Sequence, residues 1–167
     1  FLYAGLMIQK GEPYLIEYNV RMGDPECQTI LPKLKTDLLD IILACTEKKL
    51  AKTEINWHNQ NSLCIVLCSK GYPDKYKNNI LIKNLDQVIL KSNQKIYHAG
   101  TKNEKNNIFS YGGRVLNFVS LSNNFKEARD SNIEINNLEK IKLENNNFIY
   151  HAGTKIKDSK VYSNGGR

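Results

Sequence analysis

The chain has 167 residues, enough for one moderate domain or two small ones with a real hydrophobic core. Hydrophobic residues make up 41% of it and no apolar run approaches the roughly 20 residues of a membrane span, so we expect no membrane-spanning segment. The formal charge of +7 comes mostly from lysines scattered among Asn and Ile, without a basic helix or a zinc-finger spacing, and we therefore expect no nucleic-acid partner.

The ends and the cysteines of the chain bear on where the protein works. Phe1 opens on a strand-like segment without a basic leader, so we expect no signal peptide, and the lack of an initial Met predicts that the chain continues a longer protein. Cys27, Cys45, Cys64 and Cys68 lack the spacing of a metal site or of a disulfide framework. Free thiols are typical of a reducing compartment, which predicts a cytoplasmic protein.

A hairpin is predicted at the start of the chain. Two strand-like segments, Phe1–Ile8 and Tyr14–Arg21, flank a short stretch in which Gly11 and Pro13 mark a turn. Such a pair of strands is expected to be antiparallel.

Polar side chains alternate along the second strand. Glu17, Asn19 and Arg21 stand two residues apart, so they are expected on one face of the strand. The carboxylate and the amide offer hard oxygen ligands suited to Mg²⁺, and the guanidinium offers a planar donor suited to phosphate. The alternative is an edge strand with a solvated polar face.

Helices are predicted after this strand. In Gly23–Glu26, Asp24 is expected to be the N-cap and Pro25 the first residue of a short helix that ends near Pro32. A longer helix is predicted over Asp37–Leu50, where apolar residues recur at helical spacing and indicate packing against a core.

A polar stretch over residues 51–61 is a candidate domain boundary. After it, the sequence pattern predicts short strands separated by turns, followed by a helix over Ser122–Asp130 with Ser122 as its cap. The expected strands are Leu63–Ser69, Ile80–Ile82, Lys95–Thr101, Ile108–Tyr111 and Val115–Leu121. This pattern predicts an α+β domain with an antiparallel sheet.

An internal repeat is the most unusual feature. Residues 80–114 align without a gap with residues 133–167, and nearly half of the positions are identical. We expect the first copy to occupy the sheet and the second to pack peripherally or stay mobile, because only the first copy runs on into a following strand. The copies differ at Tyr111, where the second copy has Asn164.

The sequence resembles one enzyme family. The run from Glu17 to Gln28 is similar to the E-[FY]-N-x-R-[FM]-G-D-P-E-x-Q signature of the phosphoribosylamine–glycine ligases, which are ATP-grasp enzymes of purine synthesis. Further landmarks of this family follow in the right order: Phe1–Met7, Leu31–Leu39, Gly71-Tyr72-Pro73, His98–Thr101 and Gly112-Gly113-Arg114. The resemblance covers Phe1 to about Asn132, and its Asn before Gly-Gly-Arg is Tyr111 here.

The resemblance implies a fold and a division of the chain. Residues 1–55 would be the end of an ATP-grasp core, with antiparallel strands and a helix, and residues 56–132 a small antiparallel-sheet C-terminal domain. Residues 133–167 would be a partial repeat of residues 80–114. The family's N-terminal domain and ATP lid would precede Phe1, so the chain alone is expected to be inactive.

The resemblance also implies a reaction and its site. The parent enzyme would join glycine to 5-phosphoribosylamine through a glycyl phosphate, using ATP and Mg²⁺ or Mn²⁺, as a monomer. Glu17 and Asn19 match the family's metal ligands, and Arg21 matches a catalytic residue on the phosphate side. The positions implied in substrate binding are Arg21, Asp24, Glu26, His98, Gly100, Thr101 and Arg114.

Two other interpretations remain open at this point. One is a different ATP-grasp ligase, such as a biotin-dependent carboxylase, which would share an acidic-x-Asn-x-Arg strand but lack the combination of Gly-Asp-Pro-Glu and His-Ala-Gly-Thr. The other is a binding module or inactive fragment that keeps the fold without turnover.

Overall fold

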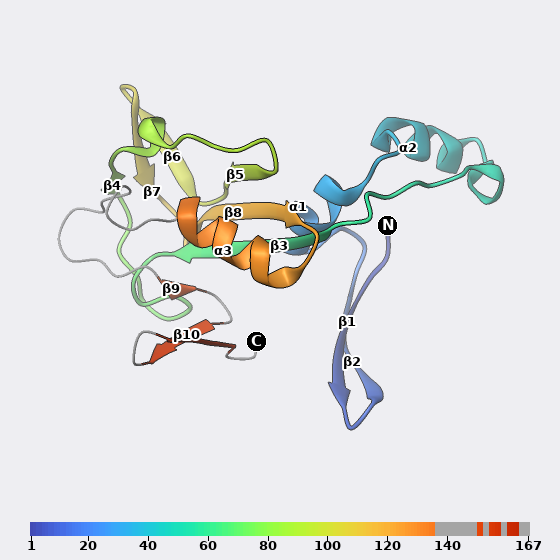
Figure 1. The fold of residues 1–167 in the computed structure, drawn as a ribbon, viewed down its shortest axis with the longest axis horizontal. Coiled ribbons are helices and arrows are strands. Elements are labelled where there is room, and N and C mark those ends of the chain that lie inside the picture. The colour runs from blue at the N-terminus through green and yellow to red at the C-terminus, as the bar shows by residue number, and fades with distance from the viewer. Residues whose placement is uncertain (136–149, 152–153, 158–159, 164–167) are drawn as a thin grey trace.

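The computed structural model describes residues 1–135, 150–151, 154–157 and 160–163 (Figure 1). Within these ranges, no helix is long and apolar enough to cross a membrane. The described chain is a mixture of helices and antiparallel sheets, as the sequence predicts.

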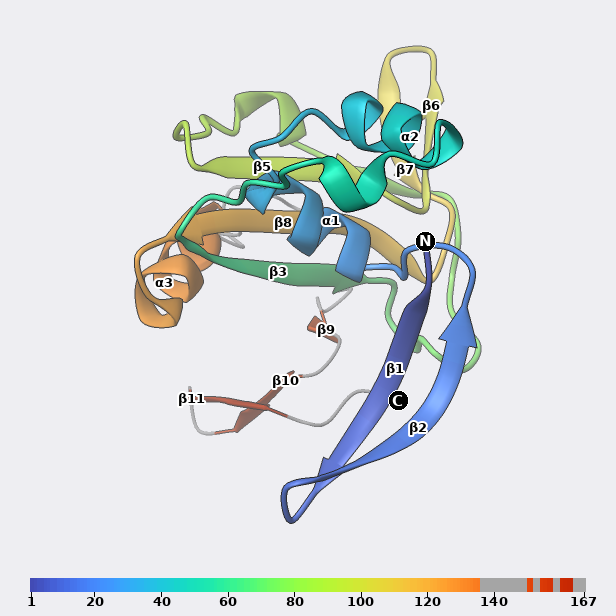
Figure 2. The ribbon, with the colours of Figure 1, turned by 90° about the vertical axis from the view of Figure 1, so that its right-hand side faces the viewer.

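The predicted hairpin is confirmed. β1 (Tyr3–Gln9) and β2 (Glu12–Asn19) pair antiparallel and project from the rest of the molecule (Figure 2). Gly11 lies in the turn with a φ of +88°, a conformation that glycine adopts at no steric cost. The register shifts between Gly5, which faces Glu17, and Leu6, which faces Leu15, so β2 carries a bulge just before the predicted metal residues.

The turn after the hairpin differs from the prediction. α1 runs over Glu26–Ile30, and its N-cap residue is Pro25, which makes no side-chain cap. Asp24 is therefore not the N-cap; its Oδ1 instead accepts a hydrogen bond of 2.8 Å from Gln28 Nε2. A 3₁₀ turn at Leu31–Lys33, which contains Pro32, follows α1, as expected for a proline that cannot continue a helix.

α2 is shorter and more exposed than predicted. It spans Leu38–Thr46, begins at the capping side chain of Asp37, and ends before Lys48, whose φ of +58° is left-handed. Ala44 is its buried residue. Of the apolar stripe, Leu38 and Ile41 are half-buried, whereas Ile42 and Cys45 are exposed. The expected core packing of its apolar stripe is wrong for this chain, because α2 lies away from the sheets (Figure 1).

The centre of the molecule is a four-stranded sheet in the order β5-β8-β3-β9. Its strands are β3 (Asn61–Cys68), β5 (Gln94–His98), β8 (Arg114–Ser122) and β9 (Tyr150–His151). β8 pairs with β5 on one side and with β3 on the other, which makes it the most buried strand of the described chain.

The side chains of alternate residues of β8 lie on the two faces of this sheet. Ser120 donates its hydroxyl hydrogen to the carbonyl of Ala128 in α3 (Phe125–Ile135). Asn117, on the other face, lies 3.8 Å from the sulfur of Cys64, and that thiol in turn hydrogen-bonds to Thr29 of α1. The central sheet is therefore covered by α3 on one face and by α1 on the other.

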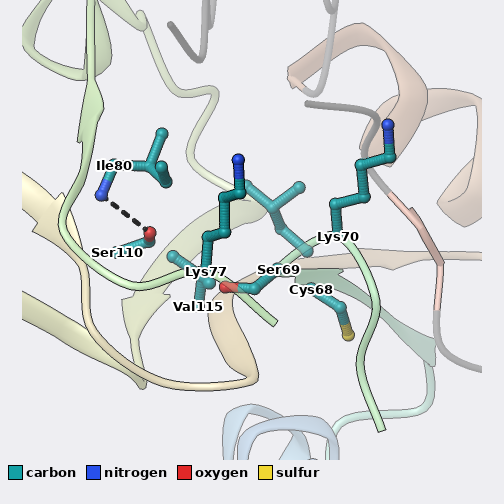
Figure 3. Close-up of a pocket in the computed structure, with 8 residues that line it drawn as sticks. Cys68, Ser69, Lys70, Lys77, Ile80, Ser110 and Val115 are labelled. Carbon is teal, nitrogen blue, oxygen red and sulfur yellow. Dashed lines mark hydrogen bonds between the residues drawn. The ribbon is translucent and has the colours of Figure 1, made fainter. Parts of the chain in front are cut away.

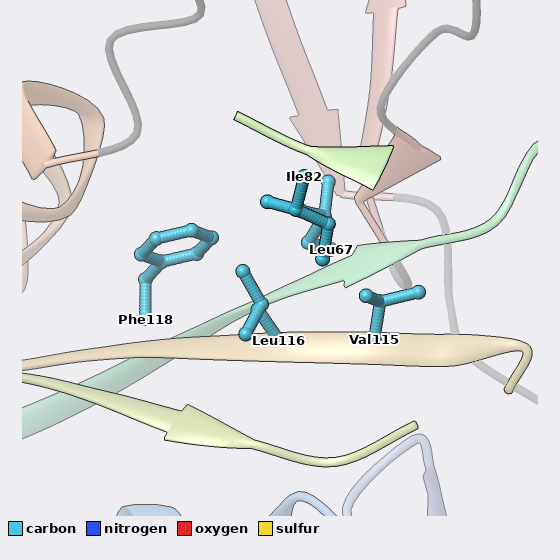
Figure 4. Close-up of a cluster of buried hydrophobic side chains, with 5 residues drawn as sticks. All are labelled: Leu67, Ile82, Val115, Leu116 and Phe118. Atoms are coloured by element: carbon cyan, nitrogen blue, oxygen red, sulfur yellow. The ribbon is translucent and has the colours of Figure 1, made fainter. Parts of the chain in front are cut away.

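The hydrophobic core lies between β8, β3 and β4 (Ile80–Ile82) (Figure 4). Its buried members are Leu67, Ile82, Val115, Leu116 and Phe118. Ile82 joins it from a second sheet, β4-β7-β6, in which β7 is Asn107–Ser110 and β6 is Thr101–Glu104.

The predicted strand Lys95–Thr101 is in fact two strands. β5 ends at His98 and β6 begins at Thr101, with Ala99 and Gly100 between them. The two residues carry the chain from the central sheet to the second sheet, a change that strand propensity alone does not signal.

The cap of α3 also differs from the prediction. Ser122 belongs to β8, and Asn124 caps the helix instead: its Oδ1 accepts from the backbone of Glu127 at 2.9 Å. Asn124 Nδ2 in turn donates to Glu127 Oε1 at 2.7 Å. The two residues, three apart in the sequence, thus hydrogen-bond to each other twice, in an arrangement that resembles a capping box.

The first copy of the repeat forms β4 to β7, as predicted. In the second copy, β9 pairs with the outer edge of β3, and β10 (Thr154–Lys157) pairs with β11 (Lys160–Ser163). The expectation of peripheral packing or mobility for the rest of this copy falls on residues outside the described ranges.

Candidate functional site

Arg114 connects two sequence motifs that lie far apart in the chain. Its Nη1 donates to the backbone carbonyl of Asp24, and its Nε lies 3.4 Å from Asp24 Oδ2. Both side chains are partly exposed, at 37% and 40%. The Gly-Asp-Pro-Glu turn and the Gly-Gly-Arg turn therefore meet at the molecular surface.

The His-Ala-Gly-Thr segment joins the same place through its backbone. Gly100 donates to the carbonyl of Arg114 at 2.8 Å, and its own carbonyl accepts from Tyr111 and Gly112 at 2.7 and 3.1 Å. A Cβ on Gly100 would lie 2.5 Å from the Gly112 Cα and 2.6 Å from the Arg114 carbonyl oxygen. Only glycine permits this approach, which explains its place in the motif.

His98 and Thr101 point toward one another across this turn. The Nδ1 of His98 lies 2.9 Å from the Thr101 hydroxyl, and the imidazole is exposed. The contact holds the ring orientation and directs Nε2 away from Thr101, where it is available for a ligand.

A third turn supports the Gly-Gly-Arg segment. Ser69 donates its backbone N–H to Gly113 O at 2.7 Å and its hydroxyl hydrogen to Gly112 O at 2.8 Å. The ring of Tyr72 lies where a Cβ on Gly113 would stand, at 2.1 Å. Ser69 was not predicted to help build the site, although it stands just before the Gly71-Tyr72-Pro73 landmark in the sequence.

The hairpin carries the predicted metal residues. Asn19 Nδ2 donates to Glu17 Oε1 at 3.0 Å, so the two side chains do lie on the same face of β2. Arg21 lies beyond the end of β2, and its Nη1 donates to the carbonyl of Met22 at 3.0 Å. The structure therefore brings Glu17 and Asn19 together but shows no contact of either with Arg21.

Tyr3 links this pair to the Gly-Asp-Pro-Glu turn, and sequence reasoning missed it. Its hydroxyl donates to Glu26 Oε1 at 3.2 Å, and Asn19 is its partner in the β1–β2 register. The pKa of Tyr3 is raised, first by desolvation and then by the negative charges of Glu26 and Glu17. Glu17 and Glu26 are therefore close enough to act on one phenol, which places negative charge on this side of the site.

A separate pocket lies at the end of β3 (Figure 3). It contains none of the sequence-predicted site residues. Its lining residues are Leu67, Cys68, Ser69, Lys70, Lys77, Ile80, Ser110 and Val115.

Two models of one enzyme family match the chain. The model of the phosphoribosylglycinamide synthetase ATP-grasp (A) domain matches residues 1–27, and that of the phosphoribosylglycinamide synthetase C domain matches residues 62–144. The chain belongs to the phosphoribosylamine–glycine ligase family.

Relatives in this ligase family extend well beyond the chain. It is 44% identical over 143 residues to the phosphoribosylamine–glycine ligase of Caldanaerobacter subterraneus subsp. tengcongensis, covering 86% of this chain and 33% of that protein. It is 38% identical over 154 residues to the ligase of Fusobacterium nucleatum, covering 92% of this chain and 36% of that protein. The chain thus spans about a third of the length of these relatives.

A solved ligase structure has the same fold. The crystal structure of phosphoribosylamine–glycine ligase from Thermotoga maritima matches with a TM-score of 0.63 and 27% sequence identity, covering 89% of this chain and 35% of that one. The interpretation as the end of an ATP-grasp core followed by a C-terminal domain agrees with this match.

The donor set of the hairpin can be tested against the divalent metal that a ligase of this family implies. Among the described residues, no group of three or more His, Cys, Asp or Glu could hold a metal ion. Glu17 and Asn19 are nevertheless adjacent and both carry hard oxygen donors. They fit an ion that takes its remaining ligands from phosphate and water, as Mg²⁺ commonly does.

Proposed function

We propose that the chain forms part of a phosphoribosylamine–glycine ligase of purine synthesis. This enzyme would join glycine to 5-phosphoribosylamine and convert ATP to ADP and phosphate. The γ-phosphoryl group passes to the glycine carboxylate, and the amine of the second substrate then displaces phosphate from the glycyl phosphate to form the amide. The contact of Arg114 with Asp24 carries the proposal, because it unites at one surface two motifs that the family resemblance implicates in the site.

Glu17 and Asn19 serve as protein ligands for Mg²⁺ or Mn²⁺ in this proposal. When bound, the metal supplies positive charge that stabilises the phosphates of ATP during phosphoryl transfer. The carboxylate of Glu17 already accepts the Asn19 amide hydrogen, so the two side chains are positioned for a shared ligand. Arg21 is assigned to a phosphate oxygen, since its guanidinium extends from the exposed end of the same strand.

The substrate-binding surface is assigned to the meeting point of the three turns. Arg114 keeps part of its guanidinium exposed and suits the phosphate of the ribosyl substrate. Asp24 and Glu26 carry negative charge suited to an amine, and Tyr3 and Gln28 fix their orientation. His98, Gly100 and Thr101 are assigned to the same surface, because Gly100 packs against the backbone of Arg114 and the His98 imidazole is exposed.

The proposal extends to the organisation of the protein. Residues 1–55 belong to the ATP-grasp core, residues 56–132 form the C-terminal domain, and residues 133–167 are a partial repeat. The protein is proposed to act as a cytoplasmic monomer without nucleic-acid or membrane partners, and its four free thiols are consistent with a reducing compartment.

We also propose that the isolated chain does not turn over. Its exposed apolar side chains support this: Leu6, Met7, Leu15 and Ile16 of the hairpin are each more than half exposed, as is Leu39 of α2. Large apolar surface of this kind is typical of a face that another part of a protein covers. Two metal donors without a nucleotide-binding lid would also hold Mg²⁺ weakly.

The test is a ligation assay on two proteins. One is the chain itself, and the other is a chimera in which residues 1–135 replace the matching part of the Caldanaerobacter ligase. We expect formation of glycinamide ribonucleotide that depends on ATP and glycine from the chimera and none from the chain alone. A folded chimera without ligation would contradict the proposal and favour a non-catalytic module; activation of a different carboxylate in place of glycine would favour another ATP-grasp ligase.

A further inference from the structure

The repeated segments form the same hairpin. In residues 94–114, the first hairpin segment, β6 pairs with β7 from Thr101↔Ser110 to Glu104↔Asn107. In residues 147–167, the second hairpin segment, β10 pairs with β11 from Thr154↔Ser163 to Lys157↔Lys160. Each pairing in the second segment falls 53 residues after its counterpart in the first, so the register is identical.

The two segments agree most where the first is packed. Of the 11 positions in the first hairpin segment that are buried or half-buried, 8 are identical in the second, whereas 3 of the 10 exposed positions are. The three differing packed positions are the conservative pairs Gln94/Asn147, Ile108/Val161 and Phe109/Tyr162. A segment that was only a surface extension would have no reason to keep the residues that packing against β8 requires.

The residues with the strictest packing demands are all kept. Gly100 touches the backbone of Gly112 and Arg114, and a Cβ there would stand within 2.6 Å of both. Their counterparts in the sequence are Gly153, Gly165 and Arg167. The second segment therefore keeps in its sequence the residue types that this packing requires of the first.

We propose that the two hairpin segments compete for one place on β8 and that the second can replace the first within the same chain. β5, the first strand of the first segment, pairs with β8 over five residue pairs, from Gln94↔Ser120 to His98↔Leu116. β9, which contains the counterparts of Tyr97 and His98, pairs over two residue pairs with the outer edge of β3. The described structure is the form in which β5 of the first segment holds the β8 edge, while β9 of the second lies at the opposite edge of the same sheet (Figure 1).

The connection between the sheet and the second segment is long enough for this exchange. Ser131 in α3 accepts hydrogen bonds from Gln94 Nε2 at the start of β5, through its carbonyl at 3.0 Å and its hydroxyl at 2.8 Å. Asn147, the counterpart of Gln94, follows Ser131 by 16 residues in the sequence. The first four of these residues belong to α3, and the 12 residues after Ile135 reach about 40 Å when extended, far beyond the width of the sheet. The displaced first segment would become a loop, and loop closure costs rise only slowly with length.

The side chain of Gln94 favours the first segment at the edge of β8. Its Oε1 accepts from the Lys91 backbone at 2.8 Å while its Nε2 reaches Ser131. Asn147 is one methylene shorter, so it is less able to reach both Ser131 and the backbone of Glu144, the counterpart of Lys91. The second segment therefore docks less favourably, and exchange is expected chiefly when docking of the first is impaired.

A cycle of glycine substitutions in the full chain tests the proposal. Gly100→Val blocks docking of the first segment, Gly153→Val is the matched change in the second, and the third variant carries both. Urea unfolding is followed by circular dichroism, and hydrogen exchange reports the protection of β8 amides. We expect Gly153→Val to leave the urea midpoint unchanged and Gly100→Val to lower it while β8 stays protected. The double variant should lose both the cooperative transition and β8 protection, so the two changes are not additive.

The opposing outcomes are equally distinct. A Gly100→Val chain that behaves like the double variant would overturn the proposal, because the second segment would then have failed to replace the first. Midpoints that add across the cycle would overturn it as well. The measurements are repeated at two chain concentrations tenfold apart; a midpoint of Gly100→Val that rises with concentration would contradict exchange within one chain.

Discussion

Arg114 reaches back 90 residues along the chain to hold Asp24, through a hydrogen bond to its carbonyl and an ion pair of 3.4 Å to its carboxylate. The contact fixes the Gly-Asp-Pro-Glu turn of the hairpin unit against the Gly-Gly-Arg turn of the sheet. It thereby relates the proposed metal residues on β2 to the proposed substrate residues on β5 to β8.

Removing this contact should weaken the attachment of the turn. Arg114→Ala is expected to lower the free energy of unfolding by about 1 kcal/mol, since both groups are partly exposed and solvent screens the pair. Urea denaturation measures the loss. Arg129→Ala is the matched control, because Arg129 pairs with Asp130 on the exposed side of α3 and its removal should change stability much less. Equal losses in the two variants would show that Arg114 is no more than a surface charge.

The N-cap of α3 is Asn124 in the structure, whereas the sequence pattern predicted Ser122. Asn124→Ala should lower the free energy of unfolding by about 1 kcal/mol, because the backbone N–H of Glu127 loses its capping oxygen. Ser122→Ala should have little effect, since Ser122 is the last residue of β8 rather than the cap. The reverse order of effects would contradict the described helix start.

Cys64 should react more slowly than Cys45 with a thiol reagent. The pKa of the Cys64 thiol is raised to about 12; burial is the largest cause, a hydrogen bond with Thr29 opposes it, and the charges of Asp24 and Glu26 contribute to the rise. At pH 8 the folded protein should therefore react quickly with a disulfide reagent at exposed Cys45 and slowly at Cys64.

The same shift makes stability depend on pH. Between about pH 9 and pH 12 the folded state keeps the Cys64 proton that the unfolded state has lost, so the free energy of unfolding falls as the pH rises. Cys64→Ala should flatten this part of the pH profile measured by urea denaturation. An unchanged slope would show that Cys64 does not contribute.

A chain that ends at Ile135 should keep the fold of the preceding residues. It retains α3, including Asn132, whose Nδ2 donates to the carbonyl of Leu63 at 2.9 Å. Among the described strand pairings with the preceding residues, it loses the short one of β9 with β3. Cooperative unfolding is expected to persist. A broad, non-cooperative transition would mean that the second copy of the repeat is part of the core structure.

The strands β2, β3 and β8 were predicted correctly, because the pattern of apolar and polar residues within each strand is enough to identify it. The alternation along β2 predicted that Glu17 and Asn19 share a face, and their hydrogen bond confirms it. The β3 and β8 strands were equally clear, because continuous apolar runs bounded by turn residues are typical of buried strands.

The predictions were wrong where contacts outside the local pattern determine the structure. Asp24 is a residue type that favours the N-cap position, but its side chain accepts a hydrogen bond from Gln28 and forms an ion pair with Arg114 instead. The apolar stripe of α2 predicted core packing, but a pattern does not show which part of a protein covers it. The break at Gly100 follows from the close approach of Gly112, a contact between two turns that spacing alone does not reveal.

The proposed metal pair gives the most direct test of the account. In the active chimera, Glu17→Gln removes the charge assigned to the metal while keeping the shape of the side chain. Glu12→Gln, on the same strand and also exposed, is the matched control. The measurement is the steady-state rate of ATP- and glycine-dependent ligation, at Mg²⁺ concentrations from limiting to saturating.

We predict that Glu17→Gln lowers the rate about a hundredfold or more, which corresponds to about 3 kcal/mol of transition-state stabilisation, while Glu12→Gln stays within about twofold of the unchanged chimera. The fold should survive in both variants, since Glu17 lies on an exposed strand face. A rate for Glu17→Gln equal to that of Glu12→Gln at limiting Mg²⁺ would contradict the assignment of the hairpin as the metal-binding strand.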